Sequence, residues 1–202
     1  MVGYAAGAIK RRIMKILVLN GSPRKHGTVA SLLRAVADGL NSEHQVDWID
    51  VYDLTMQPCM ACMKCRPDGE CCLKEDDAHR LGRMIRQADG LIIGTPTHWG
   101  NMSAQLKLLF DRNVPAFFSQ RSNGLPIPRH KGKPAVIVTA CTWPWPLNFI
   151  LAESRGAIRS VRQVLSYGGY KILGTLAQPG THHKPELSAR LLKKAKSLGS
   201  RF

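Results

Sequence analysis

The chain alternates short, continuous apolar runs with longer segments whose apolar residues recur three and four positions apart. Short apolar runs bounded by turn residues predict buried strands, whereas the wider spacing predicts helices that pack on them. The predicted strands are 15–22, 44–54, 89–96, 133–140 and 170–176. The predicted helices are 28–40, 76–89, 101–113, a long helix within 146–169, and 184–199.

Start and stop signals support several of these helices. Gly39 and Asn41 follow the first periodic segment, where they would end a helix. Asp76 stands at the start of the second predicted helix, a position that favours an aspartate. Pro185 stands near the start of the last one, where its missing N–H costs nothing.

Strands that alternate with helices five times predict an α/β protein with a doubly wound parallel sheet, covered by helices on both faces. Right-handed crossovers make the flavodoxin-like strand order 2-1-3-4-5 the natural one for five strands. Such sheets bind ligands beyond the carboxyl ends of their strands, beside the first strand. We therefore expect the chemistry in the loops that follow Asn20, Val51, Gly94 and Ala140.

The length of 202 residues fits a single domain. Met14 stands directly before the first strand, so we expect an N-terminal extension over 1–14 and a domain over 15–202. The apolar runs are too short to cross a membrane, and the start of the chain is a poor secretory signal. We therefore expect a cytoplasmic protein that makes no membrane contact and whose cysteines stay reduced.

The formal net charge of +15 admits nucleic acid, an anionic surface or a phosphate-bearing cofactor as partner. The basic residues are scattered along the chain without an aromatic-rich stacking motif of the RNA-binding type. We therefore predict a solvated basic surface and no nucleic-acid partner.

The loop after the first strand, NGSPRKHGT over 20–28, combines hydroxyl groups, cations and the start of a helix. Free backbone N–H groups at a helix start attract anions, and the side chains of Ser22, Arg24 and Lys25 add donors. The loop lacks the Gly-Lys-Ser/Thr of a P-loop and the G-x-G-x-x-G of a dinucleotide fingerprint. It predicts a phosphate site of another kind.

The loop after the third strand reads GTPTHWGN before its helix begins. Trp99 would form a wall for a flat aromatic cofactor, and backbone N–H groups around Gly100 would meet its ring heteroatoms. The competing interpretation places Trp99 in the core and His98 on the surface.

The segments GSPRKHGT, CMACMKC and ADGLIIGTPTHWGNMSAQLKLLFDR, in this order and spacing, resemble the NAD(P)H-dependent FMN reductase superfamily of flavodoxin-like proteins. The match is nearest the branch that contains the iron–sulfur flavoproteins, and it covers roughly 15–176. The resemblance implies FMN as cofactor, NAD(P)H as substrate and a structural role for the pair Asp111-Arg112. The cofactor-binding residues it implies are Ser22, Arg24, His26, Gly27, Thr28 and Val29 in the first loop, and Pro96, Thr97, His98, Trp99, Gly100 and Asn101 in the third.

Two positions depart from the family pattern. The phosphate loop reads H-G-T-V where the family often has an asparagine followed by threonine or serine, and His98 stands where a tyrosine is most frequent. A histidine beside the flavin would alter proton delivery or the shape of the substrate site.

Five of the six cysteines lie within 59–72. Cys59, Cys62 and Cys65 follow a C-x2-C-x2-C pattern, and Cys71 completes the set, with Cys72 as an alternative fourth ligand. The spacing resembles the 4Fe–4S motif of the iron–sulfur flavoproteins. Zinc fits this compact run less well, whereas free or redox-active thiols fit it about equally.

The leading functional hypothesis is an FMN-dependent oxidoreductase that transfers electrons from NAD(P)H to a quinone or another small acceptor. We expect no dedicated catalytic side chain, because the flavin carries the redox chemistry. The basic segment 129–133 would favour the extra phosphate of NADPH. The alternative is an iron–sulfur flavoprotein that shuttles electrons to or from a ferredoxin-like protein. A third hypothesis is a nucleic-acid-binding or redox-sensing protein with a degenerate flavin site.

The resemblance also implies a homodimer or homotetramer with FMN at an interface. Trp143 and Trp145, which follow the fourth strand, would cover the flavin edge or fill that interface. Cys141, just before them, is expected to be a small buried residue on the flavin side of the sheet.

Overall fold

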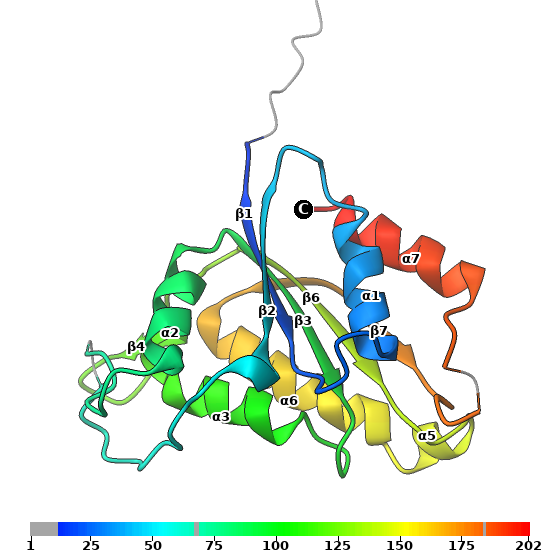
Figure 1. The fold of residues 1–202 in the computed structure, drawn as a ribbon. Coiled ribbons are helices and arrows are strands. Elements are labelled where there is room, and N and C mark those ends of the chain that lie inside the picture. Colours follow the sequence, from blue (N-terminus) through cyan, green and yellow to red (C-terminus); the bar gives the residue numbers. More distant parts are fainter. Residues whose placement is uncertain (1–11, 67–68, 184) are drawn as a thin grey trace, which may run out of the picture.

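A computed structural model describes residues 12–66, 69–183 and 185–202 of the chain. Its centre is a five-stranded sheet in the order β2-β1-β3-β6-β7, with every neighbouring pair parallel (Figure 1). Because β6 and β7 are the fourth and fifth strands of this sheet, the predicted order 2-1-3-4-5 is confirmed. Of the predicted extension over 1–14, residues 1–11 lie outside the described residues.

Most element bounds lie within a few residues of those predicted. The strands of the sheet are β1 (Lys15–Asn20), β2 (Gln45–Asp50), β3 (Gly90–Pro96), β6 (Pro134–Ala140) and β7 (Lys171–Gln178). The main helices are α1 (Thr28–Ala37), α2 (Asp77–Gln87), α3 (Ala104–Arg112), α6 (Glu153–Gly168) and α7 (Ala189–Gly199). Shorter helical elements are η1 (Val51–Asp53), α4 (Val114–Phe117) and α5 (Leu147–Ile150).

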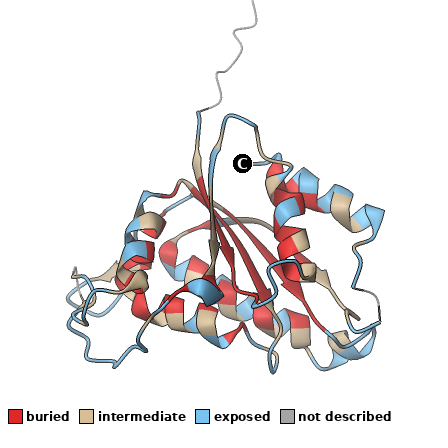
Figure 2. Ribbon diagram, in the orientation of Figure 1, coloured by how far each residue is buried: buried red, intermediate tan, exposed pale blue. Residues whose placement is uncertain are grey.

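The sheet is buried between two apolar layers (Figure 2). Alternate strand residues such as Ile16 and Val18 pack with α1 and α7 on one face. The intervening residues, such as Leu17 and Leu19, pack with α2, α3 and α6 on the other face. Successive strand side chains point to opposite faces, so a strand that is apolar throughout can contribute to both layers. Because the five strands are parallel, their carboxyl ends lie at one edge of the sheet, and the loops that follow them lie there too.

Helices α6 and α7 begin well inside the segments in which the sequence places them. The last helix, α7, begins at Ala189 because the Ser188 hydroxyl accepts a hydrogen bond from the N–H of Leu191, so Pro185 lies outside the helix. The long helix α6 begins at Glu153, directly after Ala152, whose left-handed backbone (φ 56°) separates it from the short α5. A small antiparallel pair that the sequence did not predict, β4 (Phe118–Gln120) with β5 (Pro126–Pro128), lies between α4 and β6.

The prediction that the basic segment 129–133 lies near the cofactor site is wrong. The segment directly precedes β6, so it lies at the amino edge of the parallel sheet, opposite the loops that follow the strands. His130 is buried, and the Lys133 ammonium donates to the carbonyl of Ala88 at 2.6 Å. Among the described residues, no helix combines the length and apolar character needed to cross a membrane.

Candidate functional site

The loops after β1 and β3 meet beyond the carboxyl edge of the sheet, at the bottom of Figure 1. They enclose a pocket, here called the β1–β3 pocket, to which the loop after β6 also contributes. Its lining consists of Ser22, Pro23, Arg24, Gly27, Thr28, Val29, Pro96, Thr97, His98, Ala140, Thr142 and Thr181. The pocket lies where doubly wound sheets bind their ligands.

Buried polar contacts fix the loop after β1. The Asn20 side chain, which is fully buried, donates to the Asp50 carboxylate at 2.7 Å and accepts from the N–H of Ser22 at 3.2 Å. The Ser22 hydroxyl then accepts from the N–H of Arg24 at 3.1 Å. From the α3 side, the Ser103 hydroxyl donates to the carbonyl of Gly21 at 2.7 Å. The loop is therefore preorganised before any ligand binds.

The N-terminus of α1 opens into this pocket. Gly27 is the N-cap residue, and no described side chain caps the first turn. The first N–H groups of a helix lack partners within the helix and carry a partial positive charge. Because Arg24 also lines the pocket, donors and positive charge converge there, as a phosphate group requires. The Thr28 hydroxyl donates to the carbonyl of Pro185 at 3.0 Å, so its side chain also ties the loop to the segment before α7.

The loop after β3 forms a tight two-residue turn. The N–H of His98 donates to the carbonyl of Asn101 at 3.0 Å, and the N–H of Asn101 donates back to His98 at 2.9 Å. Trp99 and Gly100 occupy the two central positions with positive φ of 51° and 66°, which is the geometry of a type I′ turn. The turn projects the Trp99 side chain into solvent, fully exposed. Trp99 therefore belongs neither to the core nor to the lining of the β1–β3 pocket.

Helix α6 supports this turn from behind. The Glu153 carboxylate accepts a hydrogen bond from the N–H of Gly100 at 3.0 Å, so this N–H is already occupied by the protein. A Cβ atom on Gly156 would lie 2.0 Å from the carbonyl oxygen of Gly100, which shows how closely the helix approaches. Only a glycine at position 156 permits this contact.

A second pocket adjoins the first and shares Thr97, His98 and Thr142 with it. It is lined in addition by Trp99, Asn101, Met102, Ala104, Lys107, Cys141, Trp143, Leu151 and Glu153. As expected, Cys141 is buried and faces this side of the sheet, and burial raises the pKa of its thiol. Trp143 and Trp145 are 46% and 77% exposed, and only Trp143 lines the pocket.

Most of the predicted cofactor residues come together in these two pockets. Two do not line either one: His26, whose side chain is exposed, and Gly100, whose N–H binds Glu153. Sequence reasoning missed Thr142 and Thr181. Thr142 follows β6, so the rule that ligands bind beyond the carboxyl ends could have found it. Thr181 reaches the pocket because its N–H and hydroxyl both donate to the Cys141 carbonyl, each at 3.1 Å.

The cysteines after β2 share a separate pocket, here called the cysteine pocket, on the teal loop at the left of Figure 1. All five cysteines of 59–72 line it, together with Met60, Ala61, Met63, Arg66, Leu73, Asp111, Arg112 and Val114. Asp111 and Arg112 end α3 and Val114 begins α4, whereas the turn over 98–101 precedes the N-terminus of α3. The two candidate sites therefore flank the same helix.

Backbone N–H groups of the cysteine loop contact two of its sulfur atoms. Ala61 and Met63 adopt left-handed conformations, with φ of 50° and 61°. The N–H of Ala61 donates to the Cys59 sulfur at 3.4 Å. The pKa of the Cys62 thiol is lowered, first by a hydrogen bond from the N–H of Lys64 and then by the Cys72 thiol. Backbone N–H groups that stabilise negatively charged sulfur at a repeated spacing suit thiolate ligands.

Two of these sulfur atoms, on Cys62 and Cys72, lie 3.4 Å apart. Burial raises the pKa of the Cys65 thiol, and the nearby Cys71 and Cys59 contribute to the same change. Within the part of the chain that the structure describes, no three His, Cys, Asp or Glu side chains form a group suited to a single metal ion. The donor set is nevertheless all sulfur, the ligand type that binds iron–sulfur clusters.

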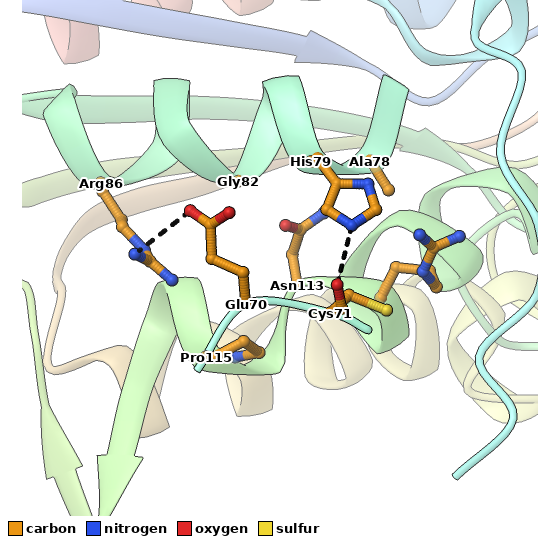
Figure 3. A pocket seen from close by; sticks show the side chains of 9 residues that line it. Glu70, Cys71, Ala78, His79, Gly82, Arg86, Asn113 and Pro115 are labelled. Atoms are coloured by element: carbon orange, nitrogen blue, oxygen red, sulfur yellow. Dashed lines mark hydrogen bonds and ion pairs between the residues drawn. The ribbon is translucent and has the colours of Figure 1, made fainter. Parts of the chain in front are cut away.

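Buried side chains anchor both ends of the cysteine loop. Arg112, whose side chain is fully buried, donates to both oxygens of the Asp76 carboxylate at 2.7 and 3.0 Å and to the carbonyl of Gln57 at 2.6 Å. His79 contacts the Cys71 carbonyl through Nε2 at 2.9 Å, as Figure 3 shows. The structural role predicted for Arg112 is consistent with these contacts.

Residues 14–169 match the family model described as NADPH-dependent FMN reductase. An iron-sulfur flavoprotein of Methanocaldococcus jannaschii is 35% identical over 103 residues, which are 50% of this chain and 53% of that protein. One of Methanosarcina thermophila is 36% identical over 102 residues, with the same two shares. The aligned part of the chain thus spans about half the length of these curated relatives.

Solved structures share the fold. An azoreductase from Bacillus anthracis superposes with a TM-score of 0.72 at 16% identity, over 94% of this chain and 100% of that one. An NAD(P)H:quinone oxidoreductase from Methanothermobacter marburgensis superposes with a TM-score of 0.70 at 19% identity, over 94% and 97%. At such identities the likeness concerns the fold alone.

Proposed function

Because this chain belongs to the NADPH-dependent FMN reductase family, we propose that it binds FMN in the β1–β3 pocket and transfers electrons from NAD(P)H to a quinone or another small acceptor. The observation that carries the proposal is the pocket itself, which joins a phosphate-binding helix start to the loop after β3 at the carboxyl edge of the sheet.

The residues fit the two ends of FMN. Ser22, Arg24 and the first N–H groups of α1, from Gly27 onward, would hold the phosphate. Pro96 and Thr97 would line the isoalloxazine on the β3 side. Bound FMN supplies the exchange of electrons with the nicotinamide and with the acceptor. The protein orients the two partners and excludes water.

The second pocket gives the nicotinamide and the acceptor room to approach. His98 lies in the linings of both pockets, so its exposed imidazole can exchange protons between the flavin side and solvent. Glu153 fixes the turn that carries His98, so this carboxylate acts as a positioning group.

FMN binding is tested by fluorescence titration of the cofactor-free protein. Arg24→Gln removes a charge-assisted hydrogen bond, which is worth about 1.5–3 kcal/mol, so we expect roughly a tenfold or greater loss of FMN affinity. Arg162→Gln, an exposed residue of α6, removes the same charge as a control. Equal affinity in both variants, or no FMN binding and no NAD(P)H oxidation by the parent protein, would contradict the proposal.

A second proposal concerns the cysteine pocket. We infer that Cys59, Cys62, Cys65 and Cys71 hold a 4Fe–4S cluster, which would make the protein an iron–sulfur flavoprotein able to accept electrons from, or pass them to, a ferredoxin-like protein. Support comes from the single pocket that all these sulfurs line and from the N–H groups directed at Cys59 and Cys62. Similarity to proteins named iron-sulfur flavoproteins favours the same assignment.

Anaerobic purification with iron and acid-labile sulfide analysis tests this cluster. Cys71→Ser and Cys72→Ser are matched variants one position apart. We expect Cys71→Ser to lose the iron and Cys72→Ser to keep it. The reverse result would make Cys72 the fourth ligand, and an iron-free, FMN-containing parent protein would leave only the FMN oxidoreductase.

We also propose a homodimer or homotetramer in the cytoplasm. Large apolar side chains are exposed beside the second pocket, which a subunit interface would cover: Trp99, Trp143, Trp145, Leu147, Phe149, Ile150 and Leu151. Light scattering of the parent protein and of Phe149→Asp tests the interface, because a buried charge there would dissociate the subunits.

A further inference from the structure

We propose that Arg112 is a positioning residue for the cluster, one that anchors the cysteine loop and places a fixed positive charge beside Cys71. This inference rests on the proposed 4Fe–4S cluster. It concerns a residue outside the ligand set, on a different element from the cysteines.

Burial and hydrogen bonding make the charge of Arg112 a fixed one. Its side chain has no exposed surface, yet the guanidinium pairs with both oxygens of Asp76 and with the carbonyl of Gln57. Arg112 and Cys71 both line the cysteine pocket, and both also line the small cavity beside it. An arginine guanidinium remains protonated in proteins, so a positive charge lies in the same pocket lining as one of the proposed ligands.

The same group of side chains holds the two ends of the loop. Gln57, two residues before Cys59, accepts from Arg112 through its carbonyl and donates its N–H to Asp76 at 3.0 Å. At the other end, the His79 imidazole binds the Cys71 carbonyl at 2.9 Å. His79 also forms a capping box with Asp76 at the start of α2. Arg112, Asp76 and His79 thus connect the loop to α2 and α3 on both sides of the sulfur atoms.

Figure 3 shows the His79 imidazole bound to the Cys71 carbonyl, beside a small cavity that Asn113 and Gly82 also line. A Cβ atom on Gly82 would lie 2.3 Å from the Asn113 amide oxygen, so α2 and the end of α3 are in direct contact. This tight packing holds the end of α3, which carries Arg112, against α2.

A positive charge at this position has a consequence for electron transfer. A cluster held by thiolates gains negative charge when it is reduced, and net charge and hydrogen bonds to sulfur set its reduction potential. A nearby buried cation interacts more favourably with the more negative, reduced form. Arg112 should therefore raise the potential of the cluster and ease the transfer of electrons to it.

The test compares Arg112→Gln, Arg112→Lys and the control Arg80→Gln in anaerobically purified protein. Arg80 is exposed on α2 and pairs with Asp77, so its loss removes the same charge without touching the cysteine loop. The readouts are iron and sulfide per chain, the midpoint potential of the cluster from a redox titration followed by electron paramagnetic resonance, and FMN content.

We expect Arg112→Gln to lower the midpoint potential and the iron content while FMN content stays unchanged. Arg112→Lys keeps the charge but cannot span both carboxylate oxygens and the carbonyl of Gln57, so it should restore the potential better than the iron content. If Arg112→Gln does not fold, the double variant with Asp76→Asn removes the unpaired carboxylate, and it is compared with Asp76→Asn alone, so that the difference belongs to Arg112.

Limited digestion of the cluster-free protein gives a second readout. Trypsin cleavage after Lys64 should be faster in Arg112→Gln than in the parent protein or in Arg80→Gln, because the loop has lost an anchor. Unchanged potential, iron content and cleavage rate would overturn this inference while leaving the cluster proposal intact. A parent protein that holds no iron after anaerobic reconstitution would overturn both, and the FMN proposal would stand separately.

Discussion

His130 is expected to make the stability of the fold depend on pH. The imidazole is 1% exposed and stacks on the Tyr170 ring with a centroid distance of 4.7 Å. Its Nε2 lies 2.8 Å from the carbonyl oxygen of Ala116. Because a carbonyl oxygen can only accept, the neutral ring carries its proton on Nε2. Its Nδ1 has no hydrogen-bond partner among the described residues.

Burial is the main reason that the pKa of His130 falls from 6.5 to about 4. The hydrogen bond to Ala116 opposes this change, whereas the positive charges of Lys133, Arg129 and Arg86 add to it. Above pH 6.5 the ring is neutral in both the folded and the unfolded chain. Below pH 6.5 the unfolded chain binds a proton that the folded chain excludes, so the free energy of unfolding falls as the pH falls.

At about 1.4 kcal/mol for each unit of pKa, the full loss below pH 4 is about 3 kcal/mol. Between pH 7 and pH 5 it amounts to about 2 kcal/mol. The measurement is the free energy of unfolding in urea at both pH values, for the parent protein and for His130→Gln at the same cofactor content. Glutamine keeps a donor for the Ala116 carbonyl and does not titrate. His182→Gln, an exposed histidine, is the control.

The test depends on the change in the free energy of unfolding between pH 7 and pH 5, not on the absolute stability of the variant. The parent protein and His182→Gln should lose about 2 kcal/mol more than His130→Gln over this interval. Parallel losses in all three proteins would refute the reasoning, because they would show that His130 titrates alike in the folded and unfolded chain.

Three further changes test the site and its surroundings. Gly156→Ala places a Cβ atom 2.0 Å from the Gly100 carbonyl oxygen, so it should displace the turn after β3 and weaken FMN binding severalfold in a fluorescence titration. Asn20→Ala removes the buried amide that holds Ser22, and we expect a loss of about 1–3 kcal/mol in urea unfolding together with weaker FMN binding. Tyr170→Phe removes a buried hydroxyl that lacks a partner among the described residues, so thermal unfolding should show unchanged or slightly higher stability.

The sheet and its main helices were predictable because the spacing of apolar residues along the chain indicates them directly. Each strand of the sheet except β2 and β7 is a nearly continuous apolar run, and the alternating connections leave few topologies. The predicted family was confirmed by the match over 14–169. The pair β4–β5 was not predictable, because its three-residue strands are too short to show a period and contain prolines.

The composition of the β1–β3 pocket was predictable from motifs, but the direction of individual side chains was not. The type I′ turn that sends Trp99 into solvent is set by the close approach of α6, a contact between residues more than fifty positions apart. The Glu153 carboxylate that takes the Gly100 N–H comes from the same helix. Long-range contacts of this kind leave no local signal in the sequence.

Helix α3 connects the two candidate sites, the β1–β3 pocket and the cysteine pocket. At its N-terminus, the Ser103 hydroxyl binds the Gly21 carbonyl of the phosphate loop, and at its C-terminus Arg112 binds Gln57 of the cysteine loop. Nine residues of helix separate these contacts by about 13 Å. Because each end of the helix is held by its own contact, loss of either contact should disturb the other site less than its own. Cofactor and iron contents of Ser103→Ala and Arg112→Gln therefore reveal whether the two sites are assembled independently: each variant should lose chiefly the group at its own end of α3.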